Sequence, residues 1–216
     1  MFTGIIEETG KIIKISSISN GKQFKISSSK ILTDLQVNHS VAVSGVCLTV
    51  ISVNKGSFSV EAVGETLKKT TLAKMKQNQS VNLERAIQMN DRIGGHLIQG
   101  HINGIGKIKK INKKGENWYL EVVIPKELNA YVIDEGSISI DGISLTIAYL
   151  ENTNIGISII PHTFKNTIIP SYKAGKDVNI EVDFLAKYVE KVLHKQIYQK
   201  DKKVIFSKEW FETLGY

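Results

Sequence analysis

The sequence predicts a mainly β protein in which two similar six-stranded β-barrels follow one another and precede a C-terminal helix. The first observation is an internal repeat, because residues 40–50 (SVAVSGVCLTV) match residues 137–147 (SISIDGISLTI) position for position at an offset of 97 residues. The second is that short runs rich in Val, Ile and Thr alternate with turn residues through both halves. The third is an apolar stripe at helical spacing after residue 184. One fold used twice in tandem is therefore expected.

The repeat extends beyond this one segment. At the same offset, residues 65–72 (ETLKKTTL) match 162–169 (HTFKNTII), and residues 80–84 (SVNLE) match 177–181 (DVNIE). The length of 216 residues suits two domains of roughly 100 residues each. We place the first domain at residues 1–96 and the second at 97–193. A C-terminal helix and tail, expected to serve oligomerisation, occupy residues 185–216.

Strand signals dominate each half. In the first half they cover residues 10–18, 24–27, 41–43, 47–53 and 57–62, and in the second 106–111, 118–124, 137–140, 144–150 and 156–160. Gly, Asn and Ser separate these runs and supply the positive φ angles that tight turns require. About six short strands in each half, regularly spaced, favour a closed barrel, which also leaves no exposed strand edge.

Short helices are expected at residues 66–72, 125–130 and 164–168. The C-terminal segment places its apolar side chains on one face of a helix of about four turns; these are Leu185, Tyr188, Val189, Val192, Leu193 and Ile197, together with Gln196. Two interpretations of this face stay open. It packs on its own barrel, or it joins copies of the chain in an oligomer.

Composition excludes several classes of protein. The net charge of +7 comes almost wholly from scattered lysines, since Arg85 and Arg92 are the only arginines, and nucleic-acid binding usually shows a localised arginine-rich stripe. The single cysteine, Cys47, precludes an intrachain disulfide and suits a reducing compartment. Neither a secretory leader nor a long apolar span is evident. The chain is expected to be soluble and cytoplasmic, without nucleic-acid or membrane partners.

The usual cofactor and metal motifs are also absent. The sequence has no phosphate-binding loop and no cluster of metal ligands. The remaining signal is the comparison of the two copies at equivalent positions. Cys47 corresponds to Ser144, Ser44 to Asp141, Ile5 to His101 and Glu65 to His162, whereas Thr49 and Thr146 are both threonine. Two similar but chemically unequal pockets suit a reaction in which two related molecules play different roles. The alternative is that these are ordinary strand-end residues of a diverged duplication.

Several motifs together resemble the riboflavin synthase family of the two-domain, lumazine-binding type. They are MFTGIIEETG at the start, GVCLTV, ETL, DRIGGHLIQGHI at the junction and DGISLTI. The resemblance implies two Greek-key barrels, a C-terminal helix that assembles a homotrimer, and active sites between barrels of neighbouring subunits. It implies dismutation of two 6,7-dimethyl-8-ribityllumazine molecules by four-carbon transfer, giving riboflavin and 5-amino-6-(ribitylamino)uracil. No cofactor or metal is expected, and association with lumazine synthase is a further implied partnership.

The resemblance also implies the substrate-binding residues. In the first pocket they are Phe2, Thr3, Gly4, Ile5, Ile6, Cys47, Leu48, Thr49, Glu61, Ala62, Val63, Gly64, Glu65 and Thr66. In the second pocket they are Gly100, His101, Ile102, Glu135, Ser144, Leu145, Thr146, Ser158, Ile159, Ile160, Pro161, His162 and Thr163. Phe2 is expected to cover a ring face of the ligand. Two positions depart from the family pattern, since His162 replaces a carboxylate and Glu135 stands where a lysine is expected.

Catalytic roles follow from the same comparison. His101 is the candidate general base, because the pKa of histidine lies near neutrality. Ser144, Thr146 and Cys47 are candidate hydrogen-bonding or nucleophilic groups, and Asp141 and Asp183 are expected to orient them or to bind ribityl hydroxyls. For His96 a structural role is preferred over a role in the site at the junction. The competing interpretation is a non-catalytic carrier of lumazine or flavin that shares this fold.

Overall fold

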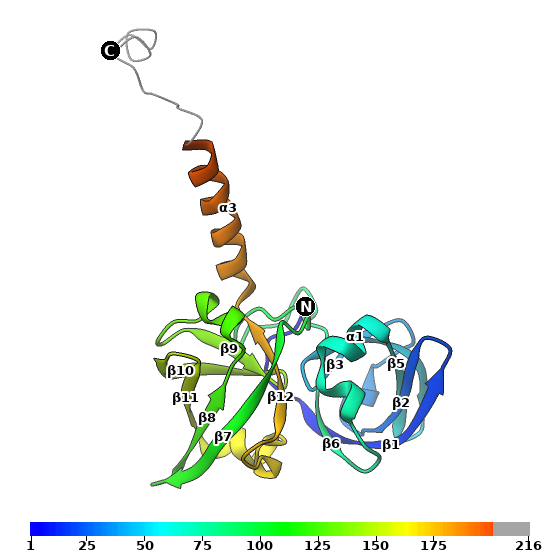
Figure 1. Cartoon of the computed structure of the whole chain (residues 1–216). Helices are drawn as coiled ribbons and strands as arrows, with labels where there is room; N and C mark the ends of the chain where they lie inside the picture. Colours follow the sequence, from blue (N-terminus) through cyan, green and yellow to red (C-terminus); the bar gives the residue numbers. More distant parts are fainter. Residues whose placement is uncertain (201–216) are drawn as a thin grey trace. The chain divides into compact units, whose positions relative to one another are not determined.

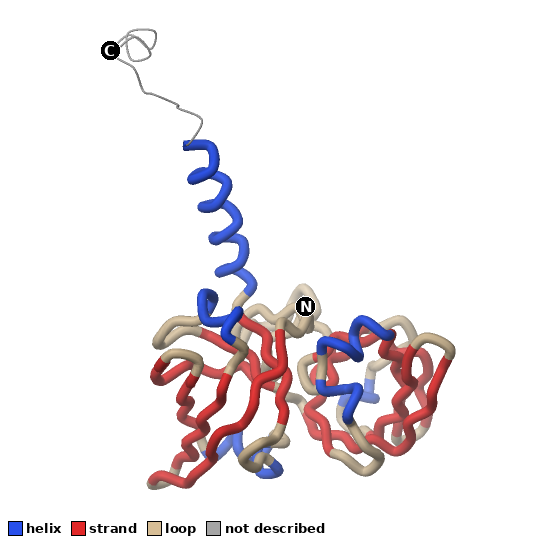
Figure 2. Tube along the Cα trace, in the orientation of Figure 1, coloured by secondary structure: helices blue, strands red, loops and turns tan. Residues whose placement is uncertain are grey.

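The computed structural model describes residues 1–200, including the side chains of residues 1–193. It divides into two units, one from Met1 to Asp183 that holds both barrels and one that starts at Phe184. The predicted fold class is confirmed, because two closed antiparallel barrels of six strands are followed by a helix (Figures 1 and 2). The tail from residue 201 onward, which belongs to the segment expected to serve oligomerisation, lies outside the described residues.

The first barrel closes in the order β1-β2-β5-β4-β3-β6. Its strands are β1 (Glu8–Ile18), β2 (Gly21–Ser27), β3 (Ser40–Val43), β4 (Val46–Asn54), β5 (Ser57–Val63) and β6 (Ser80–Arg85). The last strand returns to the first, and Glu8 lies opposite Leu83 where β1 meets β6. Strands that are distant in sequence therefore become neighbours, and no edge is left unpaired.

The second barrel repeats this order, because β7-β8-β11-β10-β9-β12 is the same cycle. Its strands are β7 (Gly104–Lys114), β8 (Asn117–Val123), β9 (Ser137–Ile140), β10 (Ile143–Glu151), β11 (Asn154–Ile159) and β12 (Asp177–Val182). Both copies also carry a register shift at the same place, between Val50 and Ser52 in β4 and between Ile147 and Tyr149 in β10. The internal repeat of the sequence is thus a repeat of structure down to its irregularities.

Short helices lie at or near the three predicted positions, and a further one is found at residues 31–33. The α-helices are α1 (Gly64–Lys69) and α2 (Pro161–Asn166), and the 3-10 helices are η1 (Ile31–Thr33), η2 (Thr71–Lys74), η3 (Lys126–Tyr131) and η4 (Ile169–Ser171). The segment predicted as one helix over 66–72 breaks at Thr70, whose backbone is extended. The Thr70 hydroxyl accepts a hydrogen bond from the Leu72 amide, so this residue ends one helix and caps the next.

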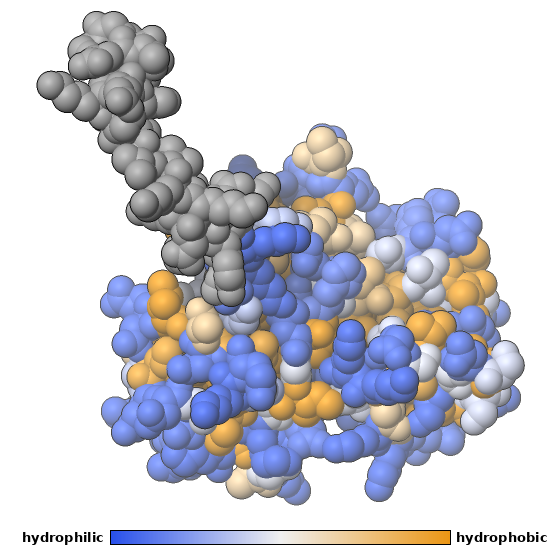
Figure 3. Space-filling view, turned by 45° about the horizontal axis from the view of Figure 1, so that its top comes forward, coloured by the Kyte–Doolittle hydropathy of each residue, from blue (hydrophilic) through white to orange (hydrophobic). Residues whose placement is uncertain are grey.

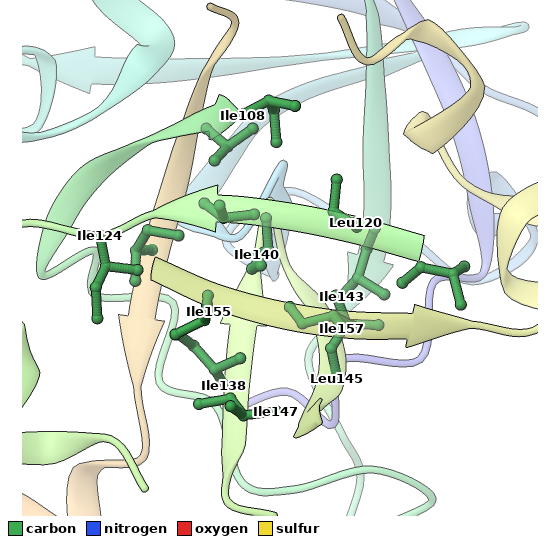
Figure 4. Close-up of a cluster of buried hydrophobic side chains, with 14 of the residues drawn as sticks. Ile108, Leu120, Ile124, Ile138, Ile140, Ile143, Leu145, Ile147, Ile155 and Ile157 are labelled. Atoms are coloured by element: carbon green, nitrogen blue, oxygen red, sulfur yellow. The ribbon is translucent and has the colours of Figure 1, made fainter. Parts of the chain in front are cut away.

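Each barrel is filled by its own apolar core. Inward-facing side chains alternate with outward-facing ones along the strands, as in β4, where Leu48 and Val50 are buried and Thr49 is exposed. The core of the second barrel is dominated by isoleucine (Figure 4), including Ile138, Ile140, Ile147, Ile155 and Ile157. Burial of these β-branched side chains on a pleated surface supplies the main driving force for folding.

The face seen in Figure 3 is largely hydrophilic, with scattered apolar areas.

The two barrels pack against each other through reciprocal hydrogen bonds. The side-chain amide of Asn82 donates to the carbonyl of Asp141, and that of Asn179 donates to the carbonyl of Ser44, at 2.9 and 2.8 Å. Asn82 and Asn179 are both completely buried. Their side-chain oxygens accept from the amides of Ile168 and Thr71 respectively. Because both the nitrogen and the oxygen of each side-chain amide are hydrogen-bonded to the other barrel, the interface fixes one arrangement of the barrels.

The second unit begins with helix α3 (Phe184–Lys200), which confirms the predicted C-terminal helix. Phe184 and Tyr188 form an edge-to-face aromatic pair within it. Its apolar side chains Leu185, Val189 and Leu193 are each more than half exposed. No helix within residues 1–200 is long and apolar enough to cross a membrane.

Candidate functional site

Two segments that precede the barrels cross from one barrel to the other. We call residues 2–6 the first crossover segment and residues 98–102 the second. They are joined by a pair of backbone hydrogen bonds between Phe2 and Ile98. Ile6 packs against the core of the second barrel, and Ile102 belongs to the core of the first. Each segment leads into the first strand of one barrel but packs a side chain into the core of the other barrel.

This arrangement differs from the grouping expected from sequence. The motifs placed Gly4 with Cys47 and Gly100 with Ser144, but the carbonyl of Gly4 accepts from the Ser144 amide and that of Gly100 accepts from the Cys47 amide, both at 2.9 Å. Phe2, expected to cover a ligand ring, is completely buried in a cluster with Ala42 and Ile98. It is a packing residue that holds the two crossover segments together.

Ser144 and His96 form the strongest candidate for chemistry. Ser144 is the second residue of β10, its side chain points outward, and its Oγ lies 2.7 Å from Nδ1 of His96. Burial lowers the pKa of His96, and the negative charge of Asp183 partly opposes this shift. The imidazole is consequently neutral near neutral pH, as an acceptor of protons must be. From sequence, a structural role was preferred for His96 over a role at the junction, and the 48 residues between it and Ser144 give no local signal of the pair.

His101 occupies a different environment from His96. It is exposed, and among the described residues none makes a hydrogen bond to its ring. Its backbone carbonyl accepts from the side-chain amide of Asn103. The ring is accessible to a ligand, but the geometry pairs Ser144 with His96 instead.

Cys47 is the first barrel's counterpart of Ser144. Its side chain is half-buried and packs beside the cluster of Phe2, Ala42 and Ile98. A Cβ atom at Gly100 would lie 2.5 Å from the Cys47 Cβ atom, so the second crossover segment runs directly over this side chain.

Each barrel carries a row of polar side chains on its outer wall. Thr49 pairs with Ser40 in the register of β3 and β4, and the pairing of Val50 with Val60 places Thr49 next to Glu61. The second barrel repeats this row with Ser137, Thr146 and Ser158. Hydroxyl and carboxylate groups in a row suit a polyhydroxyl chain. Ser40 and Ser137 were missed from sequence, although the strand register would identify them.

Other predicted site residues divide by their orientation. The side chains of Leu48, Ala62, Leu145, Ile159 and Ile102 are buried, so only their backbone can face a ligand. Those that are exposed or half-buried are Thr66, Gly64, Glu65, Val63, Pro161, Thr163, Ile160, His162 and Ile5. Glu135 is exposed in a turn with a φ of 62°, and its amide donates to the Ile147 carbonyl.

Asp141 is placed away from these outer rows. It is 3% exposed, and its carboxylate accepts hydrogen bonds from the Tyr172 hydroxyl and the Asn179 amide, both at 2.8 Å. Burial raises its pKa to about 6, against the hydrogen bonds that lower it. The carboxylate therefore lies in the interface between the barrels, and the expected role of Asp141 in orienting catalytic groups or binding ribityl hydroxyls stays a prediction.

A cavity of about 560 Å³ lies beside the first crossover segment and is lined by Thr3, Ile5, Ser40, Glu84 and Arg85, among others. Its volume is typical of small-molecule sites. Arg85 forms ion pairs with Glu7 and Asp34 at its wall, and these raise the pKa of the guanidinium. Among the described residues, no group of three His, Cys, Asp or Glu side chains could hold a metal ion.

Comparison with known proteins identifies the domains of the chain. The family model described as Lumazine binding domain matches twice, at residues 3–86 and 99–183. Among curated relatives, riboflavin synthase of Actinobacillus pleuropneumoniae is 45% identical over 91% of both chains, and that of Bacillus subtilis is 40% identical over 95% of both.

Solved structures give the same result. LumP complexed with riboflavin superposes with a TM-score of 0.80 at 26% identity, covering 85% of this chain and all of that one. LumP complexed with 6,7-dimethyl-8-(1'-D-ribityl) lumazine gives 0.77 at 26% identity, over 85% of this chain and 99% of that one. With two lumazine binding domains and relatives matched along almost its whole length, the chain belongs to the riboflavin synthase family.

Proposed function

We propose that this protein catalyses the riboflavin synthase reaction. Two molecules of 6,7-dimethyl-8-ribityllumazine react, a four-carbon unit passes from donor to acceptor, and riboflavin and 5-amino-6-(ribitylamino)uracil are released. The observation that carries the proposal is the pairing of Ser144 with His96 in the second barrel, where the first barrel has Cys47. Unequal groups at equivalent positions suit a reaction in which identical molecules take unequal roles.

The chemistry requires a proton to leave the C7 methyl group of one lumazine. His96 is the proposed base, acting on the methyl group through the Ser144 hydroxyl that lies 2.7 Å away. Asp183 stabilises the imidazolium that forms, because its negative charge raises the pKa of His96. Precise orientation of the two rings contributes further, since orientation alone lowers such barriers by roughly 7–11 kcal/mol.

The outer polar rows are the proposed sites for the ribityl chains. Ser40, Thr49 and Glu61 would bind one chain, and Ser137, Thr146 and Ser158 the other. His101 and His162 are proposed as substrate contacts, since the side chains of both are exposed. No metal or cofactor takes part in this proposal.

Assembly is also part of the proposal. Five apolar side chains of α3, namely Leu185, Tyr188, Val189, Val192 and Leu193, are more than half exposed, and a helix with such a face is stabilised by partners. We propose that these helices join three copies, as the family resemblance implies, so that pockets of neighbouring subunits face each other. A cytoplasmic location and association with lumazine synthase are proposed on the same resemblance.

A carrier that binds lumazine or flavin without turnover is the second candidate, supported by the likeness to LumP. The deciding experiment incubates the purified protein with 6,7-dimethyl-8-ribityllumazine alone and follows riboflavin by absorbance and chromatography. One pyrimidinedione for each riboflavin supports the synthase. Tight binding without product would establish the carrier.

A further inference from the structure

Each barrel contains one buried glutamate that holds a crossover segment. Glu84, on β6, accepts hydrogen bonds from the Thr3 amide at 2.7 Å, the Thr3 hydroxyl at 2.8 Å and the Gly4 amide at 3.0 Å. Glu181, at the equivalent position of β12, accepts from the amides of Gln99 and Gly100 at 2.8 and 2.9 Å. The two carboxylates are 4% and 3% exposed. Hydrogen bonds from backbone amides to a carboxylate are among the stronger ones in proteins.

The same glycines contact the candidate reactive residues, but on the opposite barrel. The Gly4 carbonyl accepts from the Ser144 amide in the second barrel, and the Gly100 carbonyl accepts from the Cys47 amide in the first. Two crossed connections result. One runs from Glu84 of the first barrel to Ser144 of the second, and the other from Glu181 of the second barrel to Cys47 of the first.

Neither connection has room to shift. Gly4 and Gly100 adopt positive φ angles of 76° and 81°. A Cβ atom on Gly4 would lie 2.6 Å from both the amide nitrogen and the Cβ atom of Ser144, and one on Gly100 would lie 2.9 Å from the Cys47 amide nitrogen. Backbone packed this closely transmits a displacement at the carboxylate to the residue beyond it.

We propose that Glu84 and Glu181 are crossed positioning residues, each of which sets the position of the reactive side chain on the other barrel. The proposal rests on the proposed function only in assigning chemistry to Ser144 and Cys47. It explains why both copies keep a glutamate here although their pockets differ. It also means that neither pocket is complete within its own barrel.

The single cysteine allows a test that does not depend on turnover. The rate of Cys47 alkylation by iodoacetamide is measured in the full-length chain and in Glu84→Gln and Glu181→Gln. The matched background is Cys47→Ser with Ser144→Cys, which moves the only thiol to the equivalent position of the other barrel. Thermal unfolding of each variant checks its folding, and Glu84→Asp and Glu181→Asp replace any glutamine variant that does not fold.

We expect a crossed pattern. Glu181→Gln changes the alkylation rate at position 47 by about tenfold, as the loss of a hydrogen bond to a charged group implies, and leaves position 144 unchanged. Glu84→Gln does the reverse. The proposal would be overturned if each variant changed the alkylation rate only at the position in the glutamate's own barrel. Equal changes at both positions, or no change at either, would overturn it as well. Failure of the wild-type chain to make riboflavin would refute the proposed function and leave this result standing.

Discussion

The Oγ atom of Ser144 lies 2.7 Å from Nδ1 of His96, and the two residues come from different parts of the chain. Ser144 stands on the outer wall of the second barrel, whereas His96 belongs to the connection between the barrels. The pair therefore forms only when the connection packs against the folded second barrel. A point mutation at either member should remove the pair without disturbing a barrel core.

We expect Ser144→Ala to lower kcat for riboflavin formation by about 100-fold, because proton transfer through a positioned side chain typically contributes that much or more. The Kd for lumazine should change little, since one hydroxyl among several is lost. Steady-state kinetics and fluorescence titration measure the two quantities. Loss of binding with unchanged turnover of bound substrate would refute the catalytic assignment.

Variants of the two histidines separate their roles. His96→Gln should reduce kcat about as much as Ser144→Ala, and the double variant should be no worse than either alone, because residues that act as a unit are not additive. His101→Ala should raise KM more than it lowers kcat. A larger loss of kcat in His101→Ala would restore the role of general base that the sequence predicts.

The pH dependence of kcat reports the charge of His96. Burial lowers the pKa of this group from 6.5, and the rate falls when the imidazole becomes protonated, so the acidic limb should lie below pH 6.5. Asp183 raises this pKa. Asp183→Asn should therefore move the limb to still lower pH, which pH–rate profiles of both proteins will measure. A shift toward higher pH would contradict the arrangement.

Asp141 should make stability depend on pH. Its pKa is about 6 in the folded chain, against 3.8 for an unperturbed aspartate such as that of the unfolded chain. Between these pH values the folded form therefore binds more protons than the unfolded form. The stabilisation from this group is lost as the pH rises through that window. Relative to Asp141→Asn, the wild type should lose about 2–3 kcal/mol between pH 4 and pH 7. Urea unfolding at both pH values tests this, and parallel curves for the two proteins would disprove it.

The reciprocal asparagines should be costly to remove. Asn82→Ala leaves the Ile168 amide and the Asp141 carbonyl without their partners in the interface. A loss of about 2–4 kcal/mol is expected, because each buried unsatisfied group costs about 1–3 kcal/mol. Asn179→Ala should cost a similar amount. Denaturant unfolding measures both, and the exposed surface variant Asn117→Ala serves as the control.

Much of the fold could be predicted from sequence because its signals are local. The alternation of apolar and polar residues, as in Leu48, Thr49 and Val50, predicts where a strand lies and which of its faces points inward. Because the sequence is repeated, each strand is predicted twice, once in each half. Breaks such as Thr70 were not predictable, since the competing hydrogen bond of its hydroxyl decides the backbone there.

The site was less predictable because its contacts are not local. No pattern near Gly4 indicates that its carbonyl meets Ser144 on the other barrel. Asp141 looked like a pocket residue because it differs from Ser44, yet that difference lies in the packing between barrels. Phe2 looked like a ligand contact because of its ring, but nothing in sequence shows that it is buried.

The reciprocity of Asn82 and Asn179 has a consequence for the origin of the chain. A contact in which each copy offers the same group to the same place on the other is the hallmark of a symmetric homodimer. The interface thus has the geometry expected of an ancestral single-barrel homodimer whose gene was duplicated and fused. Fusion would have released Cys47 and Ser144 from having to stay identical, so that one protein chain acquired two specialised halves.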